Sequence, residues 1–134
     1  MFPQHLGDYV ENKLAITPES LAGDGSSNTE DIDRQDFYSG VLAIATDTTL
    51  DAGSGTVDLV VTVQDAAEAG GSYADYDSAT FELTHGDAEI NELDLDLKGA
   101  DRYLKVIVEP DGVAADAIIT AGTLALGGSV KKPV

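Results

Sequence analysis

The sequence predicts an all-β fold: an antiparallel β-sandwich, for which a jelly roll is one fitting arrangement, with an extended N-terminal arm. Three observations predict it. Apolar and polar residues alternate over several short segments, the pattern of strands with one face in a core. Turn signals containing glycine or proline separate these segments at regular spacing. No segment between them has the helical periodicity needed to connect parallel strands.

The clearest strands lie in residues 90–109. In the first half every second residue is a leucine, and in the second half aliphatic and polar residues alternate. The apolar sets are Leu93, Leu95 and Leu97, then Leu104, Val106 and Val108. Between them lies Gly99-Ala100-Asp101, a link short enough for a β-hairpin or a tight corner.

Four further segments predict strands that cover this leucine face. Residues 37–45 are apolar on both faces, as expected of a strand that is covered on each side. Residues 56–64 and 78–84 alternate like half-buried strands, and residues 117–126 form a last strand rich in small side chains. The predicted connections are an acidic loop at residues 65–77 and turns at residues 85–87 and 110–112.

The chain of 134 residues predicts one domain with a terminal extension at each end. Residues 1–33 carry scattered apolar residues, two prolines and a turn-rich acidic stretch. We expect an arm there that orders against a neighbour, with a short helix over residues 8–16 as an alternative. Residues 34–128 are the predicted sandwich domain, and residues 129–134 are a short basic C-terminal tail.

The charge balance restricts the partners of the chain. It has 25 acidic and 7 basic residues, a net charge of −18. Such a chain repels phosphate backbones and anionic lipid surfaces, so we expect neither nucleic acid nor membrane as a partner. High acidity also suits salty surroundings, in which counterions screen self-repulsion. The basic residues gather in the last third, which is the region able to meet an acidic surface.

Composition also restricts the chemistry. There is no cysteine, which excludes disulfides, zinc–thiolate sites and thiol catalysis. The histidines, His5 and His85, have no nucleophile or carboxylate at a suggestive spacing. Asp94 and Asp96 share a strand face, but any such pair on a strand would do so. We therefore expect no enzymatic activity. The start of the chain has no signal-peptide pattern, which predicts synthesis in a cytoplasm.

The acidic loop offers two weaker hypotheses. Its carboxylates could hold calcium, because hard cations prefer clustered oxygen ligands. The candidate ligands are Asp65, Glu68, Asp75 and Asp77. Tyr73 and Tyr76 in the same loop could stack on a sugar ring, or pack beneath the loop.

From Asp33 onward the chain resembles a group of small virion proteins of tailed bacteriophages. The resemblance begins at Ile32-Asp33 before the first apolar strand and continues through a strand that ends at Gln64 and the acidic loop. Its most specific parts are the Gly-x-x-Arg-Tyr-Leu-x-Val motif of residues 99–106 and the ending Lys131-Lys132-Pro133-Val134.

This resemblance implies a capsid decoration, or cement, protein on the outer surface of a phage head. It would bind the major capsid protein and stabilise the shell as a homo-oligomer, and decoration proteins in general suggest a trimer. Capsid contacts would come from Phe2, Tyr9, Arg102, Lys131 and Lys132. Arg102 could instead form an internal ion pair, with Asp101 or Glu109 close by in sequence. The alternatives are a phage neck, tail or head-fibre component and a carbohydrate- or calcium-binding β-sandwich module.

Overall fold

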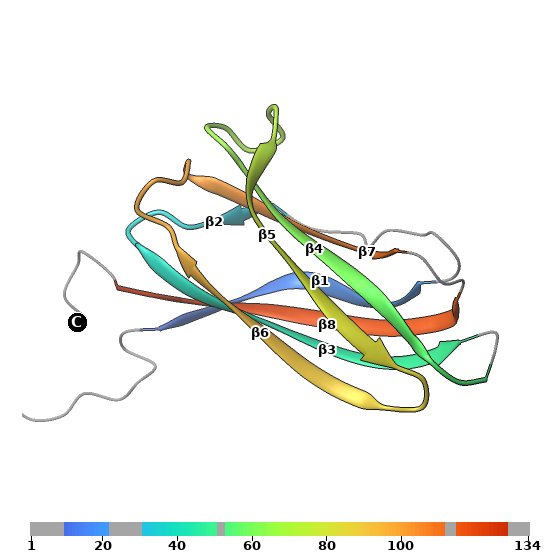
Figure 1. Ribbon diagram of the computed structural model, residues 1–134. Coiled ribbons are helices and arrows are strands. Elements are labelled where there is room, and N and C mark those ends of the chain that lie inside the picture. The colour runs from blue at the N-terminus through green and yellow to red at the C-terminus, as the bar shows by residue number, and fades with distance from the viewer. Residues whose placement is uncertain (1–9, 22–30, 51–52, 112–114, 129–134) are drawn as a thin grey trace, which may run out of the picture.

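The computed structural model describes residues 10–21, 31–50, 53–111 and 115–128, and of residues 115–117 the backbone only. These residues form eight strands (Figure 1). The strands are β1 (Glu11–Leu21), β2 (Ile32–Asp33), β3 (Ser39–Leu50), β4 (Thr56–Ala66), β5 (Ala74–Thr84), β6 (Ala88–Asp96), β7 (Tyr103–Asp111) and β8 (Ala115–Gly127). No helix long and apolar enough to cross a membrane occurs in these described ranges.

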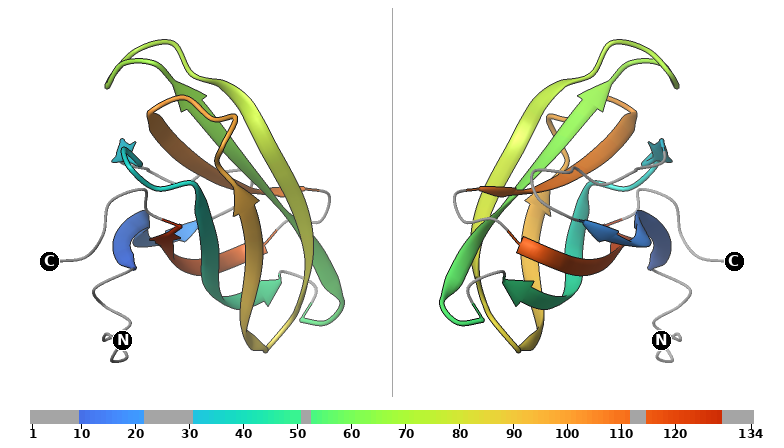
Figure 2. Two further views of the ribbon diagram at one scale, coloured as in Figure 1. Left: turned by 90° about the vertical axis from the view of Figure 1, so that its left-hand side faces the viewer. Right: turned by 90° about the vertical axis from the view of Figure 1, so that its right-hand side faces the viewer.

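Strands from the first half of the chain pair with strands from the second half in reverse order, as in a long hairpin that folds over on itself. β1 pairs with β8, β2 with β7, β3 with β6 and β4 with β5, all antiparallel. This folding produces sheet A, in the order β1-β8-β3-β6, and sheet B, in the order β2-β7-β4-β5. The two sheets pack face to face (Figures 1 and 2). This is an eight-stranded jelly roll, so the predicted all-β sandwich is confirmed.

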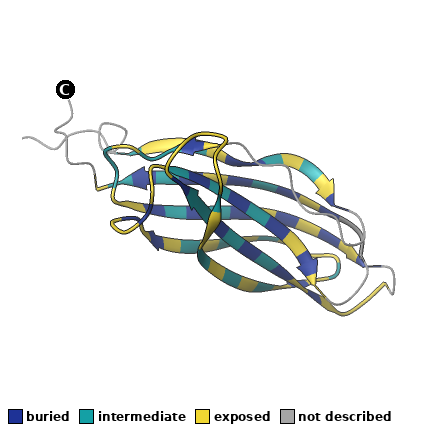
Figure 3. Cartoon of the chain, turned by 90° about the horizontal axis from the view of Figure 1, so that it is seen from above, coloured by how far each residue is buried: buried dark blue, intermediate teal, exposed yellow. Residues whose placement is uncertain are grey.

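Alternation builds the core as predicted. Along β3 every second side chain from Leu42 to Leu50 is buried, and the bands of buried and exposed residues follow the strands in Figure 3. Between the sheets lie the aliphatic side chains of both faces. From the leucine-rich stretch the core includes Leu95, Leu97, Leu104, Val106 and Val108, with Leu93 half-buried beside it.

The link at residues 99–101 makes a corner between sheets. β6 belongs to sheet A and β7 to sheet B, so the corner, and not the hairpin, is confirmed. Arg34 holds it: Nε donates to the carbonyl of Asp101 at 2.8 Å, and a terminal nitrogen donates to the carbonyl of Ala100. Charge-assisted donation from one guanidinium fixes the turn of the chain.

The predicted N-terminal arm contains a strand that sequence reasoning missed. Residues 11–21 form β1 and pair with β8, so the helix over residues 8–16 is wrong for its described part. Register shifts on either side of Ile16 place Ala15 and Ile16 both in the core, which hides the two-residue period. The sandwich therefore begins at Glu11 and not at residue 34, while residues 1–9 and 22–30 lie outside the described residues.

Two strand boundaries also differ from the prediction. β4 continues to Ala66 and β5 begins at Ala74, so the acidic connection is residues 67–73 and not 65–77. Acidic residues at both ends of the predicted loop are strand residues on solvent-facing positions. β8 runs from Ala115 to Gly127, slightly longer than predicted, and the tail at residues 129–134 lies outside the described residues.

Candidate functional site

The face of sheet A that points away from the core carries mostly small and aliphatic side chains. The pairing of β8, β3 and β6 arranges them in rows across the sheet. In order the rows are Ala125–Val41–Asp94, Thr123–Ala43–Glu92, Ala121–Ala45–Ile90 and Ile119–Asp47–Ala88, and Leu14 of β1 stands beside Thr123. We call this set of residues the outer face.

Large apolar side chains on the outer face stand in solvent. Leu14 is 49% exposed, Ile119 56% and Ile90 71%. Between Leu14 and Ile90 the alanines of β3 and β8 form a low floor, with a hollow of ≈ 220 Å³ above it. A second hollow of ≈ 220 Å³ lies beside Ile119 and Asp47. Exposed apolar surface of this kind is typical of an interaction site.

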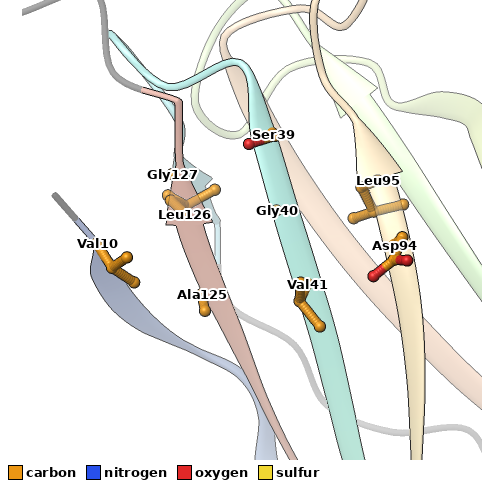
Figure 4. Close-up of a pocket in the computed structure, with 9 residues that line it drawn as sticks. All are labelled: Val10, Ser39, Gly40, Val41, Asp94, Leu95, Ala125, Leu126 and Gly127. Atoms are coloured by element: carbon orange, nitrogen blue, oxygen red, sulfur yellow. The ribbon is translucent and has the colours of Figure 1, made fainter. Parts of the chain in front are cut away.

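A third hollow, of ≈ 310 Å³, lies at the other end of the outer face (Figure 4). Val41 and Ala125 belong to neighbouring central strands, with Val10 on one side and Asp94 of β6 on the other. The three hollows therefore follow the central strands β8 and β3 from one end of sheet A to the other.

The charges of the outer face are all acidic. Asp94, Glu92 and Asp47 lie on β6 and β3, and no lysine or arginine lines any of the three hollows. Asp94 lines the third hollow, and Asp47 lines the second hollow at the opposite end of the outer face. The outer face is thus a mostly apolar strip along β8 and β3, with Asp94 and Asp47 near its ends and Glu92 beside it on β6.

A signal for the outer face was present in the sequence. Residues 37–45 were expected to be covered on both sides, because they are apolar on both faces. The structure covers the side that carries Leu42 and Ile44 and leaves Ala45 on the other side exposed. What sequence reasoning missed is that β8 continues the same open surface, with Ile118 inside and Ile119 outside.

The four carboxylates proposed for calcium are not gathered into one cluster in the structure. No group of three or more His, Cys, Asp or Glu residues within the described ranges is arranged to hold an ion. Three of the four carboxylates instead accept hydrogen bonds from other groups of the protein. Asp65 accepts from the backbone N–H of Asp101 at 2.9 Å, Asp75 from the side-chain amide of Gln64 at 2.9 Å, and Asp77 from the backbone N–H of Ser78 at 2.8 Å.

The tyrosines near the acidic loop are tied to the protein. The hydroxyl of Tyr73 donates to Asp31 at 2.6 Å, and the ammonium of Lys105 lies 4.6 Å from the centre of the Tyr73 ring. Tyr76 packs against the core and donates to the carbonyl of Asp96. These contacts favour the alternative in which both rings pack against the protein over the one in which they stack on a sugar.

Asp31 and Tyr73 change each other's titration. Burial, followed by the hydrogen bond to the Asp31 carboxylate, raises the pKa of Tyr73 to about 12. The same hydrogen bond, with the N–H of Gly70 and the charge of Lys105, lowers the pKa of Asp31. Through Asp31, these contacts connect Gly70 and Tyr73 of the β4–β5 connection to the residue before β2 and to Lys105 of β7. Their role is therefore structural.

Arg102 forms an internal ion pair, which was the alternative to a capsid contact, but its partner is neither of the two acidic residues close to it in sequence. Its guanidinium donates two hydrogen bonds to Asp33, at 3.0 and 2.8 Å, and not to Asp101 or Glu109. This pair joins β2 to the start of β7 and lowers the pKa of Asp33. The other predicted contact residues, Phe2, Tyr9, Lys131 and Lys132, lie outside the described residues.

The candidate acid–base groups either accept backbone hydrogen bonds or lie away from one another. His85 accepts the backbone N–H of Leu50 at Nδ1, at 3.0 Å, while His5 lies outside the described residues. Asp96 accepts the backbone N–H of Lys98 at 3.1 Å, and Asp94 belongs to the outer face. Among the described residues, no hydrogen bond or ion pair joins His85, Asp94 and Asp96 to one another. We therefore take the outer face as the candidate functional site.

Comparison with known proteins supports the fold. No protein-family model matches the chain, and no curated protein matches it. Among solved structures, one of infectious bursal disease virus, Gx strain, has a TM-score of 0.59 at 14% identity, over 92% of this chain and 33% of that one. The crystal structure of the T13 particle of the same virus gives a TM-score of 0.58 at 15% identity, over 87% and 30%.

A third similar structure comes from a different class of protein. It contains the CBM22-1 and GH10 modules of endo-1,4-β-D-xylanase 10B from Clostridium thermocellum, complexed with xylohexaose, with a TM-score of 0.58 at 10% identity over 92% of this chain and 27% of that one. The chain spans about a third or less of each of the three. None is a tailed-phage protein, and identities this low show a shared fold alone.

Proposed function

We propose that the chain is a structural protein of a virus particle, which binds the outside of a tailed-phage head as a decoration protein. One observation carries this proposal: the outer face of sheet A exposes Leu14, Ile90 and Ile119 beside hollows lined mainly by small and aliphatic residues, on a chain of net charge −18. The jelly roll supports it, because it is a fold that viral capsid proteins use. The resemblance of residues 99–106 and 131–134 supplies the tailed-phage setting.

The proposal includes the absence of catalysis. A decoration protein acts by adding contacts to a shell, for which it needs a rigid body and a docking surface. Two contacts support such a body: Arg34 holds the corner at residues 99–101, and Arg102 with Asp33 holds the β2–β7 pairing. The partner in this proposal is the major capsid protein, and copies of the chain associate on the shell, with a trimer as the expected oligomer.

Co-sedimentation tests the proposal. Purified chain is mixed with capsids that lack it, the particles are pelleted, and the copies bound per particle are counted. Saturable binding of hundreds of copies is expected of a decoration protein. About a dozen copies or fewer would place the chain at the neck or tail, and no binding by the full chain would overturn the proposal.

A carbohydrate-binding module is the second candidate, since the fold is shared with a structure that contains such a module. Sugar recognition commonly uses exposed aromatic rings as stacking platforms, but none of the residues lining the three hollows is aromatic. Tyr73 and Tyr76 are held by Asp31 and Asp96. Tyrosine fluorescence during titration with xylohexaose decides this: a saturable change favours the module, and a flat response favours the virion protein.

A further inference from the structure

We propose that the outer face of sheet A binds an extended segment of another protein, in which aliphatic side chains lie between two basic residues about 20 Å apart. This inference rests on the proposed function and names the chemistry of the capsid segment that the chain would bind. It follows from the spacing of the two end carboxylates, from the shape of the strip between them and from the size of the surface.

The spacing comes from the pairing of β3. Asp94 of β6 stands opposite Val41 of β3, and Asp47 lies on β3, six residues after Val41. At about 3.3 Å per residue, the rows of Asp94 and Asp47 are roughly 20 Å apart. A peptide in extended conformation covers this length with seven residues, and its first and seventh side chains point to the same side. Lysine or arginine at these positions would meet the two carboxylates.

The shape between the carboxylates fits two aliphatic side chains. The rows of Ala43 and Ala45 lie between those of Val41 and Asp47, which matches the third and fifth residues of the peptide. On the β8 side these rows continue with Thr123 and Ala121, while Glu92 stands on the β6 side of the Ala43 row. Leu14 and Ile90 stand on either side of the alanine floor and would flank the inserted side chains. Because this floor is made of alanine, glycine and threonine, it leaves room for leucine-sized groups.

The size and charge of the outer face argue against a second copy of the chain as the occupant. Four strands about 4.8 Å apart and roughly 20 Å long present roughly 400 Å², about half of what each partner of a stable complex usually buries. In a symmetric dimer each outer face would also meet another outer face. Asp47, Glu92 and Asp94 would then face acidic side chains, with no basic residue lining the hollows to pair with them.

The first test uses the full chain and three synthetic peptides, followed by amide chemical shifts. The probe is Lys-Thr-Leu-Thr-Leu-Thr-Lys with blocked ends. The controls replace both lysines with glutamate, or both leucines with serine. We expect shifts in β3 and β8 with the probe and an affinity about tenfold lower or worse for each control. Equal binding of the glutamate control, shifts confined to sheet B, or no shifts at millimolar probe would overturn the proposal.

Matched variants locate the binding. Asp47→Lys with Asp94→Lys reverses both end charges, and the control pair Asp58→Lys with Glu82→Lys makes the same charge change on opposed exposed residues of sheet B. The first variant is expected to prefer the glutamate peptide, while the control keeps the preference for lysine. Ala121→Gln fills the floor without adding charge and should abolish binding. If the Asp47→Lys, Asp94→Lys variant still prefers the lysine peptide and Ala121→Gln still binds it, the outer face is not the site.

The outcomes separate this inference from the proposed function. If capsids bind wild-type chain and the Asp47→Lys, Asp94→Lys variant equally, the decoration role stands and the assignment of the outer face falls. If the probe binds the outer face but capsids bind no chain, the docking chemistry stands and the decoration role falls. If shifts in β3 and β8 depend on protein concentration without peptide, the occupant is a second copy and the inference is overturned.

Discussion

Replacing two buried threonines with valine is predicted to stabilise the protein. Thr46 of β3 and Thr120 of β8 face each other across the central pair of sheet A, with 4% and 1% of their surface exposed. Within the described part of the chain, neither hydroxyl has a hydrogen-bond partner. A buried hydroxyl that lacks a partner costs about 1–3 kcal/mol relative to an apolar group of the same shape.

Valine keeps the shape and the β-branch of threonine, so the strand itself is not disturbed. We expect Thr46→Val and Thr120→Val each to raise the free energy of unfolding by about 1 kcal/mol. The two residues are paired across neighbouring strands, so the gain in unfolding free energy of the double variant need not equal the sum of the single gains. We expect a gain of about 2 kcal/mol for the double variant.

Urea unfolding monitored by circular dichroism measures these changes. The matched control is Thr123→Val, on the same strand but on the exposed outer face, where the change should stay within about 0.5 kcal/mol. The transition midpoint should move to higher urea without a change in slope. If the buried variants are destabilised, or shift no more than Thr123→Val, the inner-face assignment of these threonines is wrong.

Three further predictions test other parts of the structure. Gly122→Ala should destabilise by about 1–3 kcal/mol, because a Cβ there would lie 2.8 Å from Cδ1 of Ile16; an unchanged urea midpoint would contradict this contact. Tyr73 should ionise above the usual range of a tyrosine, and Asp31→Asn should lower its pKa. Because the pKa of Tyr73 is raised to about 12, neutral Tyr73 stabilises the folded protein fully below about pH 10, and this stabilisation is lost as the pH rises through 12. Near-ultraviolet absorbance of the phenolate would follow the ionisation. Stability should rise with added potassium chloride because the net charge is −18, whereas a flat salt dependence would remove the role given to self-repulsion.

Much of the fold could be predicted because a two-residue period survives in the sequence. Residues 56–64 and Leu93 to Leu97 alternate visibly; the first segment lies in β4, and the second lies in β6 up to its end at Asp96. β1 could not be found in this way, because the register shifts around Ile16 break the period. The link at residues 99–101 left a hairpin and a corner equally open, since its length suits both.

Contacts between distant residues explain most of what could not be predicted about the site. The partner of Arg102 is Asp33, 69 residues away in sequence, and the partner of Tyr73 is Asp31, 42 residues away. Only the register of β3 with its two neighbours reveals that Asp47 and Asp94 stand at opposite ends of one apolar strip. The apolar character on both sides of residues 37–45 was visible in the sequence, and it predicts a cover that the described chain does not supply.

The orientation of the chain on a capsid tests the central claim most directly. An electron cryomicroscopy reconstruction of capsids saturated with the full chain would show which sheet meets the shell. The claim predicts that sheet A lies against the capsid, with density of the capsid protein along the strip between Asp94 and Asp47. Contact through sheet B, with the Leu14, Ile90 and Ile119 side chains facing solvent, would contradict it.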